Sequence, residues 1–358
     1  MRKKKILLTG ASGSVGTQIF KELLKRLDQY QLKIFARESK KNKKLFRPYD
    51  ECIEITWGDI LNLKKCKEAV KDQDIIIHAA ALIPPQAYKD PDYTYQVNVC
   101  GTENILQAAK ISNSEPKIIY TSSIAIYGDR LDTPLIKAED EPNPNDIYGY
   151  TKVKAENLIN NSGFEYIIYR LSYVATVDTL RFNPILFRMP LKTPIEVIHV
   201  EDVALGIVRS LEIEQLWNAV YNLGGGEKCR ITFKKYLNNL LEIMGLGRDY
   251  FPESSFAGGG FNCGYIKNNP KLQKFLDYQN HDLPDFYQEV KEWIGVKRYF
   301  ARIFRWFIKK YLLYRLRRYE NYKNDSSDSI RKYMELMPSA CQDIQRTSQG
   351  TRDDLRTL

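Results

Sequence analysis

The sequence predicts an α/β fold in which helices cover both faces of a doubly wound parallel sheet. Two observations lead to this prediction. Short apolar runs alternate with amphipathic stretches over the first 170 residues, and a glycine-rich turn joins the first apolar run to the first amphipathic stretch. Strands that alternate with helices in this way are typical of βαβ crossovers, which make the strands parallel. An apolar content of 43% is enough for such a fold to bury a core.

Six apolar runs are expected to form the strands of this sheet. They lie at Ile6–Leu8, Lys33–Ala36, Ile53–Trp57, Asp74–His78, Lys117–Thr121 and Tyr166–Arg170. Helices are expected between them, for example at Val15–Leu27, Tyr93–Ala109 and Ile147–Asn161. In the first of these helices the apolar residues recur at the spacing of one helix face. Six strands joined by crossovers of this length predict a Rossmann-like sheet.

The chain is less regular after residue 170, and its composition changes again near residue 296. A strand at Ile195–Ile198, a helix at Asp202–Leu211 and a strand at Ala219–Asn222 are expected before a region of small helices. The sequence predicts a Rossmann domain of residues 1–170 plus about 195–222, and a small, mostly C-terminal substrate lobe of residues 171–194 and 223–295. A basic amphipathic helix is predicted at 296–320, and a disordered tail at 321–358.

The net charge of +10 is concentrated at the C-terminal end of the chain. Residues 297–318 contain nine Lys/Arg and no acidic residue. Apolar residues recur there at helical spacing, at Phe300, Ile303, Phe304, Phe307, Tyr311 and Tyr314. A helix with a basic face and an aromatic face is typical of contact with an acidic membrane surface. The alternative is a helix packed on the body of the protein or on a second subunit. No recognised binding module accompanies the charge, so nucleic acid is not expected.

No segment of the sequence predicts secretion or a membrane span. The apolar run near the N-terminus ends at Leu8, which is short for a signal peptide, and no window offers the roughly 18 apolar residues of a spanning helix. The six cysteines are scattered without a CxxC pair, so no metal site is expected and a reducing compartment fits best. A cytoplasmic location is predicted, at the inner face of a membrane if the basic helix binds lipid.

The glycine-rich turn predicts a site for the pyrophosphate of a dinucleotide. Glycines let the backbone approach the phosphates closely, and the N-terminus of the following helix offers free N–H groups and a partial positive charge. The alternative is a tight turn that binds nothing. The residues expected to contact the cofactor here are Gly10, Ser12, Gly13, Ser14, Val15 and Gly16.

The GxxGxxG spacing of this turn resembles that of the extended short-chain dehydrogenases/reductases, also called the NAD-dependent epimerase/dehydratase family. The resemblance covers roughly residues 4–295, and further matching segments follow in order. They are Gly58-Asp59, His78-Ala79-Ala80-Ala81, Asn98-Val99-Cys100-Gly101-Thr102, Thr121-Ser122-Ser123, Tyr148-Gly149-Tyr150-Thr151-Lys152, His199 to Ala204, and Tyr221 to Gly225.

The resemblance implies a set of cofactor contacts beyond the glycine turn. In the family, an acidic residue at the end of the third strand contacts the adenine, and the residues after the fourth strand lie beside the ribose. An asparagine on the next helix supports the family's active site. The residues at these positions, with those of the later motifs, are Asp59, Ile60, Ala79, Ala80, Ala81, Asn98, Ser122, Tyr148 and Lys152.

The sequence favours NADP over NAD as the nicotinamide cofactor. Arg37 lies just after the second strand, where the family carries the acid that binds the ribose. A guanidinium suits the 2′-phosphate of NADP. The alternative is that Arg37 is a solvated loop residue and that the neighbouring Glu38 accepts from the ribose hydroxyl of NAD.

Tyr148 and Lys152 are the predicted catalytic pair, with Ser123 as the third member. The two residues are four positions apart on a helix and therefore share one face. A free phenol titrates near pH ~10, and a neighbouring ammonium together with a positive nicotinamide ring is expected to lower this pKa. Ser123 is expected to hydrogen-bond the substrate oxygen, with Ser122 as the fallback. Tyr150 faces away from Lys152 and is expected to be structural.

The sequence narrows the reaction more than the substrate. Ile124 and Ala125 occupy the positions where related 4,6-dehydratases carry an acidic pair, so dehydration is disfavoured. The leading hypothesis is an NAD(P)-dependent epimerase or oxidoreductase of a sugar nucleotide, whose diphosphate Arg181, Arg188 and Lys192 could meet. The alternatives are an NADP-dependent reductase of a small or lipid-like carbonyl compound and a non-catalytic, cofactor-binding scaffold. The resemblance also implies a homodimer.

Overall fold

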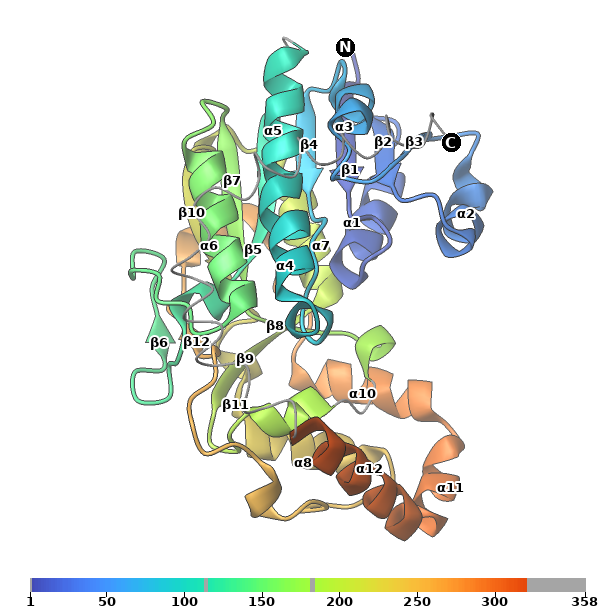
Figure 1. The fold of residues 1–358 in the computed structure, drawn as a ribbon, viewed down its shortest axis with the longest axis vertical. Helices are drawn as coiled ribbons and strands as arrows, with labels where there is room; N and C mark the ends of the chain where they lie inside the picture. The colour runs from blue at the N-terminus through green and yellow to red at the C-terminus, as the bar shows by residue number, and fades with distance from the viewer. Residues whose placement is uncertain (1, 113–114, 181–183, 321–358) are drawn as a thin grey trace, which may run out of the picture.

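The computed structural model describes residues 2–112, 115–180 and 184–320, and it confirms the predicted doubly wound sheet (Figure 1). Seven parallel strands are ordered β10-β7-β5-β4-β1-β2-β3. The chain reverses its direction of winding between β1 and β4, and ligands of such sheets bind at that point. The strands are β1 (Lys4–Thr9), β2 (Tyr30–Ala36), β3 (Glu54–Trp57), β4 (Ile75–His78), β5 (Lys117–Ser123), β7 (Tyr166–Leu171) and β10 (Ala219–Leu223).

Helices cover both faces of the sheet because successive strand residues point to opposite sides. Ile6 and Leu8 of β1 pack in the same apolar cluster as the first helical layer, whereas Leu7 between them packs with the second. The first layer consists of α1 (Ser14–Leu24) and α7 (Val200–Ser210), with α2 (Lys40–Phe46) and α9 (Pro270–Leu276) at its margins. The second layer consists of α3 (Leu63–Val70), α5 (Gly101–Ile111) and α6 (Ile147–Asn160).

The helix predicted at Tyr93–Ala109 is interrupted. It consists of α4 (Pro91–Tyr95), a π-helical turn at Gln96–Cys100, and α5. A π-helical turn inserts an extra residue into the helical ladder and is frequent at functional sites. The spacing of apolar residues does not indicate a π-helical turn here, because α4, the turn and α5 follow one another without a gap.

A smaller lobe lies at the carboxyl ends of the strands (Figure 1). Its three-stranded sheet has the order β11-β9-β8, and a two-stranded pair flanks it. Its elements are β8 (Tyr173–Ala175), β9 (Pro194–His199), β11 (Arg230–Thr232), the pair β6 (Leu135–Ile136) and β12 (Tyr265–Ile266), α8 (Phe233–Ile243) and α10 (Leu283–Ile294).

β9 is the predicted strand Ile195–Ile198, which was expected to lie with the Rossmann domain, and it does not join the main sheet. It pairs with β8 and β11 instead. Every residue of β9 is buried: Ile198 packs in the main core, whereas Ile195 and Val197 pack in the core of the lobe. An apolar run shows that a strand is buried, but it carries no information about which strands are its partners.

The single basic helix expected at 296–320 is also divided. α11 (Lys297–Ile303) ends at Phe304, and α12 (Arg305–Glu320) continues in a new direction across the lobe (Figure 1). In the part of the chain that the structure describes, no helix is both long and apolar enough to cross a membrane. The predicted disordered tail, 321–358, lies outside the described residues.

Candidate active site

The glycine turn brings the ends of β1 and β4 into contact. Gly10 has a φ of +73°, and a Cβ at this position would lie 2.5 Å from the carbonyl carbon of Ala79. A Cβ at Gly16 would lie 2.1 Å from the carbonyl oxygen of Gly10. Both positions therefore require glycine. The backbone N–H groups in the first turn of α1 have no partner within the helix, which is an arrangement that suits a pyrophosphate.

His78 at the end of β4 organises the loop that follows. The Thr9 hydroxyl lies 2.7 Å from its Nδ1, and the Thr102 hydroxyl lies 3.0 Å from its Nε2. Thr9 Oγ1 also accepts from the N–H of Ala80 at 3.2 Å. Burial, together with the charge of Lys152, lowers the pKa of His78 to about 3. His78 is therefore neutral and serves the structure of the loop.

Asn98 connects this loop to the helix that carries Tyr148 and Lys152. Its side-chain oxygen accepts from the N–H of Leu82 at 2.7 Å, and its amide nitrogen donates to the carbonyl of the same residue at 3.0 Å. The amide nitrogen also lies 3.0 Å from the hydroxyl of Thr151 on α6. The π-helical turn points Asn98 into this position, which agrees with the supporting role that the resemblance implies.

Tyr148, Lys152 and Ser123 lie together. α6 begins at Asp146, whose carboxylate accepts from the N–H of Gly149 at 2.7 Å, and Tyr148 and Lys152 follow on consecutive turns. Ser123 at the end of β5 hydrogen-bonds Tyr148. Lys152 Nζ donates to the carbonyl of Thr121 at 2.7 Å and lies 5.8 Å from the centroid of the Tyr148 ring.

Burial shifts the pKa of both the Tyr148 and the Lys152 side chain. Burial raises the pKa of Tyr148 above that of a free phenol, although the hydrogen bond with Ser123 lowers it. Burial lowers the pKa of Lys152 to about 7, against the opposing effect of Glu156. The phenol is therefore protonated at neutral pH, and a positive charge bound beside it would lower its pKa.

Ser122 and Ser123 point into different environments. The Ser122 hydroxyl donates to the carboxylate of Glu156, which also receives Nε and Nη2 of Arg170 at 3.1 and 2.8 Å. Arg170 in turn donates to the Tyr127 hydroxyl at 2.6 Å. The Ser122 side chain is thus committed to a buried ionic network behind the site, and Ser123 is the hydroxyl beside Tyr148. The sequence analysis did not anticipate this network.

The region expected to receive the adenosine is exposed. Arg37 lies directly after β2 and is exposed, and Glu38 pairs with Lys43 at 2.7 Å. The carboxylate of Asp59 accepts from the N–H of Leu61 at 2.9 Å. Ile60 is buried, and its carbonyl accepts from the side chain of Asn104 at 3.1 Å. These residues lie at the ends of β2 and β3, beside the glycine turn at the end of β1.

Asp146 is a buried residue of the site that sequence reasoning missed. Its carboxylate accepts from the Tyr88 hydroxyl at 2.6 Å and from the Asn262 side chain at 2.7 Å, which ties α6 to the lobe. Arg188 lies over the Tyr88 ring at 4.6 Å, so one of the three predicted diphosphate-binding residues is next to the Tyr88–Asp146 hydrogen bond. Lys192 is exposed, and Arg181 lies outside the described residues. An aspartate two positions before Tyr148 was the available signal for the helix start.

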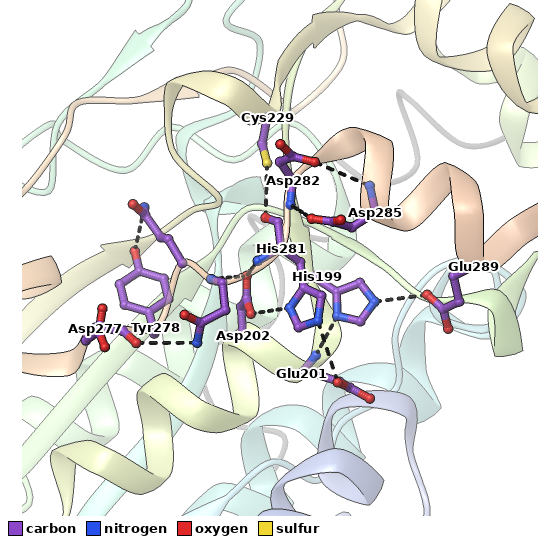
Figure 2. Close-up of polar contacts among 12 residues, drawn as sticks. His199, Glu201, Asp202, Cys229, Asp277, Tyr278, His281, Asp282, Asp285 and Glu289 are labelled. Carbon is purple, nitrogen blue, oxygen red and sulfur yellow. Dashed lines mark hydrogen bonds and ion pairs between the residues drawn. The ribbon is translucent and has the colours of Figure 1, made fainter.

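Two stacked histidines join the main domain to the lobe (Figure 2). The ring of His199, at the end of β9, lies 4.2 Å from that of His281, which precedes α10. His281 Nδ1 bonds the buried carboxylate of Asp202 at 2.6 Å, and His199 Nε2 bonds Glu289 at 3.0 Å. Ligand atoms of both histidines and Glu201 lie within 4.8 Å of one another. His199 Nδ1 also accepts from the N–H of Glu201 at 3.3 Å, so three of the four ring nitrogens already have hydrogen-bond partners in the protein.

This histidine pair predicts a pH-dependent contribution to stability. The hydrogen bond with Asp202 raises the pKa of His281, and the negative charges of Asp202, Glu201 and Asp285 raise it further. Burial acts in the opposite direction and lowers this pKa. Because the folded pKa exceeds the unfolded value of about 6.5, the stabilisation is complete below that pH and is lost as pH rises through the folded pKa. The stability difference between the wild type and His281→Gln, measured by urea unfolding from about pH 5.5 to 8.5, should therefore shrink with rising pH. A constant difference would contradict this assignment.

Comparison with known proteins places this geometry in a family. The fold and the glycine turn first define an α/β protein with a Rossmann-like sheet. The sequence model described as "NAD dependent epimerase/dehydratase family" matches residues 6–224, and the chain belongs to that family. It is an enzyme of the extended short-chain dehydrogenase/reductase type, which confirms the resemblance seen in the sequence.

Individual relatives act on different substrates. The chain is 26% identical over 270 residues to a D-erythronate dehydrogenase of Haemophilus influenzae, covering 67% of this chain and 82% of that protein. It is 32% identical over 129 residues to a UDP-glucose 4-epimerase of Rickettsia bellii, covering 35% and 38%. A UDP-glucuronic acid 4-epimerase of Bacillus cereus, solved with NAD, has a similar fold with a TM-score of 0.68 at 20% identity, covering 81% of this chain and 98% of that one.

Proposed function

We propose that this enzyme is an NAD(P)-dependent epimerase or oxidoreductase of a sugar nucleotide and that Tyr148, Lys152 and Ser123 form its catalytic site. The observation that carries the proposal is the meeting of Ser123 and Tyr148 at the carboxyl ends of the central strands, one helical turn from Lys152. Relatives named as UDP-sugar epimerases and the proximity of Arg188 to the site support a diphosphate substrate.

The residues divide the chemistry between them. A nicotinamide dinucleotide held at the glycine turn of Gly10, Gly13 and Gly16 would supply the hydride chemistry. Tyr148 holds the proton that moves to or from the substrate oxygen, and Ser123 orients that oxygen. Lys152 Nζ donates a hydrogen bond to the carbonyl of Thr121, and this bond fixes the position of its side-chain nitrogen. Asn98 hydrogen-bonds both the loop after β4 and α6, and it thereby fixes the position of the loop relative to the helix.

Net redox change separates the two enzymatic hypotheses. An epimerase returns its hydride to the substrate, so incubation with UDP-sugars should yield the epimer, seen by NMR, without net change in the absorbance of the reduced cofactor. A reductase of a small or lipid-like carbonyl compound consumes the reduced cofactor. Mass spectrometry of the cofactor retained by freshly purified protein is an independent measurement. Binding of cofactor with neither product nor redox change across both substrate classes would instead favour a scaffold.

The NADP preference is proposed on Arg37 alone, since the similar solved structures contain NAD. Its exposed guanidinium after β2 can meet a 2′-phosphate, and the Glu38 carboxylate is already paired with Lys43. Arg37→Gln is expected to weaken 2′,5′-ADP binding by about 10- to 100-fold, the value of a charge-assisted hydrogen bond, and to leave AMP binding unchanged. Equal affinity of the wild type for both ligands, measured by calorimetry, would contradict the preference.

The proposal also includes two partners. The helix region containing α4, α5 and α6 resembles the family's dimer surface, so a homodimer is proposed, to be checked by sedimentation. Residues 297–318 are proposed to contact the inner face of a membrane.

A further inference from the structure

We propose that α11 and α12 form a docking surface for an anionic lipid bilayer. The exposed aromatic side chains of the two helices would enter the bilayer interface, and their basic side chains would bind its anionic headgroups. We call residues 293–315 the tail platform. The inference deepens the membrane contact of the proposed function by naming its partner and its contacting residues. Its test does not use catalysis, so it can fail without the proposed reaction failing, and the reverse also holds.

One face of the tail platform is already used for packing on the lobe. The side chains that pack against the apolar core of the lobe are Ile294, Ala301, Ile308, Leu312 and Leu313. The Tyr250 hydroxyl donates to the carbonyl of Arg305, and Lys309 lies over the Tyr250 ring at 5.6 Å. A Cβ at Gly245 would lie 2.2 Å from the carbonyl oxygen of Arg298, so this turn approaches α11 closely. The helices are therefore held on the lobe in a defined orientation.

The remaining apolar side chains of the tail platform are exposed. Ten of the thirteen large apolar residues that are exposed in the described part of the chain belong to it. They are Trp293, Val296, Tyr299, Phe300, Ile303, Phe304, Trp306, Phe307, Tyr311 and Tyr314, with exposed fractions from 45% to 73%. All six residues whose spacing predicted an apolar helix face are among them. Packing on the lobe thus uses other side chains, and the aromatic side chains of the platform remain exposed.

The charge on the tail platform favours an anionic partner. Residues 293–315 carry seven Lys/Arg and no acidic residue. Within the described residues, Arg298, Arg302, Arg305, Lys310 and Arg315 form no ion pair. Several lie beside exposed rings; for example, Lys310 is 4.0 Å from the centroid of Trp306. Aromatic rings at headgroup depth with cations beside them are the usual anchors of interfacial helices.

A bilayer fits this surface better than a second copy of the chain or a nucleic acid. A second copy would bring the same excess of positive charge to the interface, and like charges repel. A nucleic acid would match the charge, but the exposed aliphatic side chains of Val296 and Ile303 would have no role on a phosphate backbone. Anionic lipid satisfies both the charge and the apolar area. In Figure 1 the two helices lie at the end of the lobe away from the seven-stranded sheet.

Vesicle flotation of the full chain tests the electrostatic part. The protein is expected to float with phosphatidylcholine vesicles that contain phosphatidylglycerol and to remain unbound with phosphatidylcholine alone. The variant Arg298→Gln/Arg302→Gln/Lys310→Gln should bind the anionic vesicles about 100-fold more weakly, because each basic residue near the surface contributes several-fold. The matched control Lys40→Gln/Lys41→Gln/Lys44→Gln removes as many charges from the exposed surface of α2 and should bind within about threefold of the wild type.

A second variant tests insertion of the aromatic residues. Phe300→Ser/Phe307→Ser keeps every charge and every packing residue, and it should weaken vesicle binding at least tenfold while thermal stability is retained. Trp306 fluorescence should shift to shorter wavelength on binding, and Trp306→Phe should remove most of that shift. Binding that is equal on neutral vesicles, or weakened as much by the α2 control, would overturn the proposal. So would absence of flotation, or a dimer in sedimentation that Phe300→Ser/Phe307→Ser dissociates.

Discussion

Replacing Tyr148 by phenylalanine is expected to lower turnover by about 10²- to 10⁴-fold, the usual contribution of a positioned proton donor. The change removes only the hydroxyl that Ser123 hydrogen-bonds, so the ring remains packed on α6. Dinucleotide binding should change little, since the glycine turn and the Lys152–Thr121 bond are unaffected. Steady-state kinetics with the substrate found by the UDP-sugar screen, together with calorimetric titration of the dinucleotide, would measure both quantities.

Tyr150→Phe is the matched control for this experiment. Tyr150 lies two positions further along α6, and its ring is 6.5 Å from that of Tyr95 in a small apolar cluster. Removal of its hydroxyl is expected to leave turnover within about threefold of the wild type, because it faces away from the site. Equal losses in the two variants, or full activity in Tyr148→Phe, would show that the assignment of the proton donor is wrong.

The second large effect is expected from the buried pair behind the site. Arg170 and Glu156 are 8% and 4% exposed, and their shortest contact is 2.8 Å. Arg170→Met leaves the Glu156 charge buried with the Ser122 hydroxyl and without its cationic partner. Breaking such a pair typically lowers the free energy of unfolding by about 3–5 kcal/mol. Urea unfolding followed by circular dichroism would measure the loss.

The double variant Glu156→Leu/Arg170→Met should recover much of this loss, because it removes both charges together. Lys234→Met serves as the surface control: Lys234 pairs with Glu253 at 2.6 Å, but both side chains are largely exposed, so no measurable change is expected. If the single and double variants were equally unstable, the packing of the Arg170 side chain would account for the effect and the ion pair would not.

Local patterns in the sequence were sufficient for much of the fold and the site. The strand–turn–helix of residues 4–24, with glycine required at Gly10 and Gly16, follows from the geometry of the turn itself. The four-residue spacing of Tyr148 and Lys152 on one helix follows from helical geometry, and the structure agrees. These features depend on residues that are close in the chain, and for this reason the sequence predicts them.

Other features depend on contacts between distant segments. Whether Ser122 or Ser123 faces Tyr148 was decided by Glu156 and Arg170, which draw the Ser122 hydroxyl into the buried network. The pairing of β9 with β8 and β11 was decided by the two cores between which it is buried.

The tail shows the same distinction most clearly. The sequence by itself determined that residues 297–318 are helical, basic and aromatic. Only the tertiary structure decided that Ile308, Leu312 and Leu313 pack on the lobe while the aromatic residues remain exposed. The physical reason is that periodicity records which residues are apolar, whereas the shape and charge of the neighbouring surface select the face that is buried.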